Sequence, residues 1–106
     1  LHLIMKYDKL IRDSIPEILK QKGLVPITHI ADEEEYRIKL REKLREEVRE
    51  YIKSGEKEEL SDILEVIYAI CDFEKMGADE LENIRKDKRE KRGGFEKKII
   101  LDEIKD

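Results

Sequence analysis

Apolar residues recur every three or four positions through the middle of the chain, which is the spacing of helices with one buried face. One such run ends at Ser54-Gly55, and a second extends from about Glu56 to Met76, just before Gly77. Glycine commonly ends helices, and a short connection usually joins antiparallel neighbours. The pattern therefore predicts two long helices that fold back on each other as an antiparallel hairpin.

Capping patterns set the expected bounds of these helices. Asp32, with Glu35 three positions later, forms a capping-box pattern at the start of the first long helix. A further helix is expected to begin near Asp79, with Glu82 as its capping partner. The second half of this helix is rich in basic residues, and the helix is expected to end at Gly93-Gly94.

The remaining segments are short. Ser14 as a candidate cap, Pro16 in the first turn and Gly23 as the end predict a short helix within 14–23. The β-branched stretch "LVPITHIA" (24–31) predicts a short strand or extended segment, and "FEKKIILDEI" (95–104) predicts a strand that pairs with it. The fold class expected is mostly α, a single domain over 1–106 with short N- and C-terminal extended segments.

Composition narrows the functional classes. Of 106 residues, 47% are charged, and the net charge of −4 arises from 23 basic and 27 acidic residues that alternate along the chain. A nucleic-acid-binding face needs a basic excess, so no nucleic-acid partner is expected. No apolar run reaches the ~18 residues of a membrane span and no signal peptide is visible, so we expect a cytoplasmic protein without membrane contact.

Two single residues carry further expectations. Cys71 is the only cysteine, which excludes an intrachain disulfide, and its apolar neighbours predict a core position. Met5 is expected to be the natural start, with residues 1–4 an upstream extension.

Four acidic residues border the apolar stripes of the two long helices. With Glu47 at zero on a helical wheel, the apolar residues spread over roughly 20° to 140°, and Glu50 falls at about −60°. With Glu59 at zero in the next helix, the apolar residues cover about the same arc, and Asp62 falls at about −60°. Both acidic pairs therefore lie at the edge of the surface that faces the partner helix.

The positions across the turn predict that these acids meet. In an antiparallel hairpin, residues whose numbers share a sum lie opposite each other, which pairs Glu47 with Asp62 and Glu50 with Glu59. Converging carboxylates repel unless a cation compensates them. An all-oxygen set suits Mg²⁺, with Mn²⁺ as an alternative. Only His2 and His29 offer nitrogen ligands.

A simpler interpretation is that the acids form surface salt bridges in a very polar, thermophile-like chain. Glu46 is either a supporting residue of the site or solvated. The basic residues available for such salt bridges are Lys43, Arg45, Arg49, Lys53 and Lys57.

Three motifs in order resemble the MazG-like, all-α nucleoside triphosphate pyrophosphohydrolase superfamily. "EEVRE" (46–50) and "ELSD" (59–62) match its EExxE and ExxD pattern. "YDKLIRDSIPEIL" (7–19) is similar to the "KLVRDKIPEI" opening of its phosphoribosyl-ATP pyrophosphohydrolase-like subgroup, and "KREKRGGF" (88–95) matches that subgroup's closing "RGGF". The resemblance extends over residues 6–95.

The resemblance implies a function. The four acids would be both the Mg²⁺ ligands and the catalytic residues of an enzyme that cleaves the α–β phosphoanhydride of a nucleoside triphosphate. It also implies a homodimer or homotetramer, with the N-terminal segment reaching a neighbour's site. The residues expected to contact the phosphates of the substrate are Lys9, Arg12, Lys88, Lys91 and Arg92.

Alternatives remain for these basic residues and for the function. Arg12 is adjacent to Asp13 and could form a structural ion pair with it, and the basic end of the last helix complements the helix dipole. Two other functions are open: phosphoribosyl-ATP hydrolysis in histidine biosynthesis, and a non-catalytic helical oligomerisation or regulatory module.

Overall fold

The computed structural model describes residues 4–106, which form four helices and no strand. The predicted fold class, mostly α, is therefore confirmed over this range. His2 and most of the expected extension at 1–4 lie outside the described residues. The helices are α1 (Ile15–Gln21), α2 (Glu33–Ser54), α3 (Lys57–Phe73) and α4 (Ala78–Arg92).

The ends of α2 follow the sequence signals. The Asp32 carboxylate accepts a hydrogen bond of 2.8 Å from the Glu35 backbone N–H, as a helix N-cap does. The Glu35 side chain contacts His29 Nε2 at 2.8 Å instead of returning to Asp32, so only half of the capping box forms. Gly55 has a φ of 67°, and its N–H donates to the Tyr51 carbonyl at 2.7 Å. A residue with a Cβ would be strained in this left-handed conformation.

α4 spans Ala78–Arg92, in agreement with the predicted start near Asp79 and the stop at Gly93-Gly94, whereas the end of α3 and the capping of α4 differ from the prediction. α3 ends at Phe73 rather than near Met76, because the chain turns through Lys75 with a φ of 56°. The N-cap position of α4 is Gly77 and not Asp79. The Glu82 side chain pairs with Arg85 instead of capping the helix.

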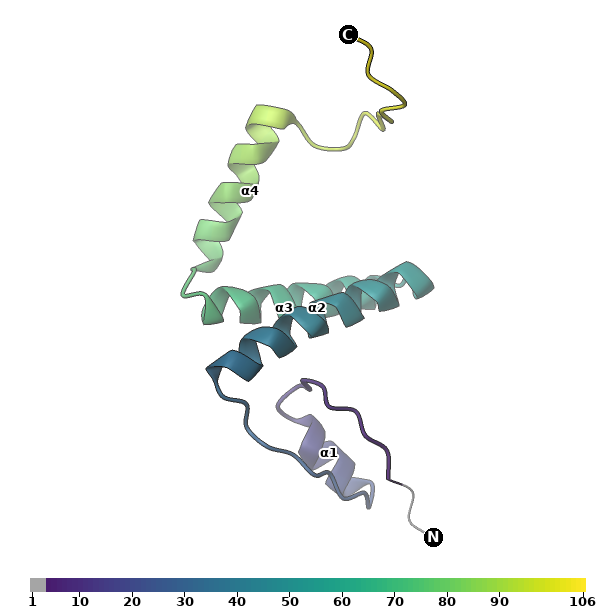
Figure 1. Ribbon diagram of the computed structural model, residues 1–106, viewed down its shortest axis with the longest axis vertical. Coiled ribbons are helices and arrows are strands. Elements are labelled where there is room, and N and C mark those ends of the chain that lie inside the picture. Colours follow the sequence, from purple (N-terminus) through teal and green to yellow (C-terminus); the bar gives the residue numbers. More distant parts are fainter. Residues whose placement is uncertain (1–3) are drawn as a thin grey trace.

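α2 and α3 pack along each other in opposite directions and form the predicted helical hairpin (Figure 1). Leu40 of α2 and Val66 and Cys71 of α3 are buried, so the expected core position of Cys71 is confirmed. Tyr36 and Phe73 add an edge-to-face ring contact with centroids 5.5 Å apart. Apolar packing between these two helices is what holds the acidic residues in place.

The predicted strands at 24–31 and 95–104 and their pairing are wrong. Neither segment forms a strand, and they lie near opposite ends of the molecule (Figure 1). A strand needs a partner edge for its backbone hydrogen bonds, and β-branched residues alone do not supply one. Both segments are extended or turn-containing chain, as the coarser prediction had it.

The molecule is elongated, with principal extents of 65 × 31 × 26 Å. α4 packs against α3 alone among the described helices and then leads away from the hairpin (Figure 1). No helix within residues 4–106 is long and apolar enough to cross a membrane.

Candidate metal centre

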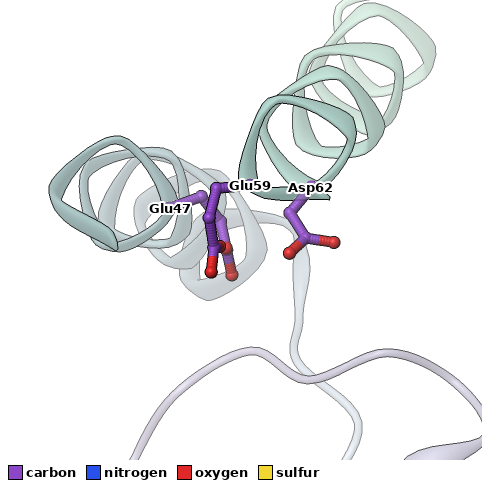
Figure 2. Close-up of side chains that lie close together, drawn as sticks. All are labelled: Glu47, Glu59 and Asp62. Carbon is purple, nitrogen blue, oxygen red and sulfur yellow. The ribbon is translucent and has the colours of Figure 1, made fainter. Parts of the chain in front are cut away.

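Three carboxylates converge on one broad face of the hairpin. Glu47 extends from α2, and Glu59 and Asp62 extend from α3, with one oxygen from each within 4.8 Å of the others. All three point to the side on which the N-terminal segment passes (Figure 2). The i,i+3 spacing keeps Glu59 and Asp62 on one edge of α3, and antiparallel packing brings Glu47 across to them. We call these three residues the carboxylate cluster.

Glu50, the fourth acid predicted for the site, is exposed and lies outside the cluster. It still acts on the cluster through its charge. Partial burial raises the pKa of Glu59 above its ordinary value, and the negative charges of Asp62, Glu50 and Glu47 raise it further. Ionisation of Glu59 is therefore less favourable in the folded chain than in a free glutamate side chain.

The N-terminal segment brings two basic side chains to this face. Arg12 Nη2 donates to Asp62 Oδ1 at 2.8 Å, and Lys9 Nζ donates to Glu46 Oε1 at 2.8 Å. Arg12 is therefore paired with Asp62 and not with its neighbour Asp13. Lys9 and Arg12, predicted to contact phosphates, reach the acidic face of their own chain and need no neighbour to do so.

Lys43 is the residue that sequence reasoning placed only among the surface salt-bridge partners. Its Nζ lies 3.3 Å from Glu47 and 3.1 Å from Glu46, and its side chain is only 15% exposed. It precedes Glu47 by four residues, so the helical wheel places both on the same edge of α2. That spacing was the signal that could have identified Lys43.

Glu46 links the two lysines to each other. Partial burial acts to raise the pKa of Glu46, but the hydrogen bonds from Lys9 and Lys43 outweigh it and lower the pKa. The hydrogen bond with Glu46 raises the pKa of Lys9 in turn. Lys9 is thus favoured in its charged form beside the cluster. Glu46 is therefore partly buried and paired with both lysines.

A pocket of about 270 Å³ opens between the N-terminal segment and the hairpin. Its walls combine three cations, two carboxylates of the cluster and two isoleucines. The cations and carboxylates are interleaved along these walls, since Arg12 contacts Asp62 and Lys43 contacts Glu47. The lining residues are Lys9, Ile11, Arg12, Ile15, Lys43, Glu47 and Asp62.

The three basic residues predicted on the last helix lie elsewhere. Lys88, Lys91 and Arg92 belong to α4, which leads away from the hairpin (Figure 1). Lys91 pairs with Asp87 at 2.9 Å, and Arg92 lies beside the C-terminal segment. The structure does not bring them to the carboxylate cluster of their own chain.

The chemistry of the cluster is that of a hard-cation site, since it offers oxygen ligands only. Comparisons with protein-family models, curated proteins and solved structures give no match to this chain.

Proposed function

We propose that this protein is a Mg²⁺-dependent nucleoside triphosphate pyrophosphohydrolase of the MazG-like, all-α type. The observation that carries the proposal is the convergence of three carboxylates from two antiparallel helices beside a pocket that also contains three cations. The order of the "EEVRE", "ELSD" and "RGGF" motifs supports it. Phosphate transfer chemistry requires both charge types, one to hold the metal and one to hold the phosphates.

The cluster fits a divalent cation. It has no nitrogen or sulfur ligand, it draws on two helices, and the pKa of Glu59 is raised by partial burial and by the neighbouring carboxylates. Glu47, Glu59 and Asp62 would hold Mg²⁺, with Glu50 adding negative charge from the next turn. Mg²⁺ bound there would supply neutralisation of phosphate oxygens and a lowered pKa for the attacking water. Mn²⁺ is the expected substitute.

The protein's own side chains would then bind and orient the substrate. Arg12, Lys9 and Lys43 would exchange their present carboxylate partners for phosphate oxygens, which form similar charge-assisted hydrogen bonds. One of the glutamates of this face would accept the proton of the attacking water. The products would be a nucleoside monophosphate and pyrophosphate.

The chain is also proposed to act as a homodimer or homotetramer. Lys88, Lys91 and Arg92 would then serve as phosphate contacts only if an assembly brings α4 of one copy to the pocket of another. In a single chain they are too far along α4 to take part (Figure 1).

Pyrophosphate release from a panel of ordinary and damaged nucleoside triphosphates and phosphoribosyl-ATP tests the proposal. We expect release of pyrophosphate and monophosphate from at least one compound, dependent on Mg²⁺ and abolished by EDTA. Asp62→Asn should abolish it, whereas Asp72→Asn, an exposed aspartate of the same helix, should not. Activity confined to phosphoribosyl-ATP would assign the histidine-pathway reaction. No release from any compound would favour a non-catalytic helical module.

A further inference from the structure

The protein exposes far more surface than a compact globular protein of the same mass. Its accessible surface is 10335 Å², whereas a compact 12.7 kDa protein exposes roughly 6,200 Å². Its radius of gyration is 18.8 Å, compared with about 13 Å for a compact domain of this length. The excess of roughly 4,000 Å² is several times the ~800 Å² that each partner buries in a stable dimer.

The C-terminal segment 95–104, which we call the arm, contributes to this exposed surface. Its large apolar side chains are between 73% and 96% exposed, so they find no cover in their own chain. Arg89 of α4 pairs with Glu96 at 2.5 Å, and the Lys98 N–H donates to the Phe95 carbonyl at 3.1 Å. The first contact joins the start of the arm to α4, and the second closes a turn within the arm. The apolar residues of the arm are Phe95, Ile99, Ile100, Leu101 and Ile104.

A second apolar surface is uncovered on the hairpin, and we call it the outer apolar face. Its side chains are between 38% and 77% exposed. On the helical wheel they lie at about 100° to 180°, whereas the acids lie at about −60° to 0°. The face is thus turned away from the side to which the carboxylates point in Figure 2. It consists of Val48, Ile52, Leu60, Leu64 and Tyr68.

The two surfaces are separated within one chain. α4 leads the arm away from its own hairpin (Figure 1). Because each copy has one uncovered arm and one uncovered face, a twofold pair can satisfy both surfaces reciprocally.

We propose that the chain forms an arm-exchanged homodimer, in which the arm of each copy packs on the outer apolar face of the other. This contact leaves the carboxylate cluster and its pocket open on the opposite side of each hairpin. The inference rests on apolar burial and does not depend on the proposed enzymatic activity. Either one can fail while the other holds.

Sedimentation equilibrium over a dilution series tests the exchange in the full chain. The wild type should be a dimer, and joint substitution of Ile99, Ile100 and Leu101 by serine should raise the Kd at least about 1,000-fold, since each buried aliphatic side chain contributes roughly tenfold. The control replaces Lys97 and Lys98 by serine and should leave the Kd unchanged. A monomeric wild type, or equal Kd values for the wild type and the triple variant, would overturn the proposal. Circular dichroism should show unchanged helix content throughout.

Disulfide cross-linking identifies the contact directly. In a Cys71→Ala background, a chain with Leu64→Cys is mixed with a chain with Ile100→Cys and oxidised. A disulfide between the two chains is expected. Glu58→Cys lies about 120° from position 64 on the wheel of α3, and it should not form this disulfide. If the two cysteines placed in one chain give only an intrachain disulfide in a monomer, the arm folds on its own hairpin and the proposal is wrong.

Discussion

The Glu59 side chain combines a destabilising charge with a proposed functional role. Its pKa is raised by partial burial and by three neighbouring carboxylates. When the pKa of a carboxyl group is higher in the folded than in the unfolded state, the free energy of unfolding decreases as the pH rises through the folded-state pKa. We therefore expect Glu59→Gln to increase the melting temperature in EDTA at neutral pH. The wild type should approach the variant as the pH is lowered through the raised pKa of Glu59. A variant that melts below the wild type in EDTA at neutral pH would contradict this account.

Arg12 is positioned to exchange one anion for another. It now donates a charge-assisted hydrogen bond to Asp62, and in the proposed complex it donates to a phosphate. Such bonds contribute roughly 1.5–3 kcal/mol, so Arg12→Gln should reduce kcat/KM by about 10- to 100-fold. Arg85→Gln, which removes an arginine paired with Glu82 on α4, should leave kcat/KM unchanged. Steady-state kinetics of both variants checks the prediction, and equal losses would rule out a specific role for Arg12.

Much of the site at the residue scale could be predicted from helical spacing. The wheel and the turn placed Glu47 opposite Asp62, and the structure brings both into one cluster. Glu50 has the right direction on the wheel, but a wheel does not fix how far its side chain extends toward the others. The pairing of Arg12 with Asp62 depends on a loop path, which local sequence patterns do not encode.

The turn between α2 and α3 determines whether the cluster can form at all. Gly55 ends α2 in a left-handed conformation with a φ of 67°, whereas Gly77 caps α4 with a φ of −69°. Gly55→Ala should destabilise the protein by about 1 kcal/mol, which lowers the melting temperature by roughly 4–8 °C. Gly77→Ala adds a methyl group in open space at an ordinary φ and should change the melting temperature little. Thermal unfolding of both variants checks this. Equal melting temperatures would mean that the turn tolerates alanine.

Element types were predictable where periodicity was strong and failed where it was weak. The bounds of α2 follow from Asp32 and Gly55, because capping is a local interaction. The strands expected at 24–31 and 95–104 do not form, because β propensity describes a paired surface and neither segment finds a pair.

At the scale of the whole molecule, the chain combines a small core with two exposed surfaces of different chemistry. The hairpin presents carboxylates on one side and uncovered apolar residues on the other. Periodicity predicted the hairpin, but it could not show that α4 and the arm lead away from it, because that depends on contacts absent from any local window. This separation leaves the pocket accessible while the apolar surface is available for a second copy.

Calorimetric titration with Mg²⁺ tests the central claim most directly, since it asks whether the three carboxylates bind a divalent cation. The matched variants are Glu59→Gln, within the cluster, and Glu58→Gln, its exposed neighbour on the same helix. We predict that the wild type and Glu58→Gln bind Mg²⁺ with the same Kd, and that Glu59→Gln binds at least about tenfold more weakly, because it lacks one anionic ligand. No binding by the wild type, or an equal Kd for all three proteins, would contradict the assignment of a metal centre.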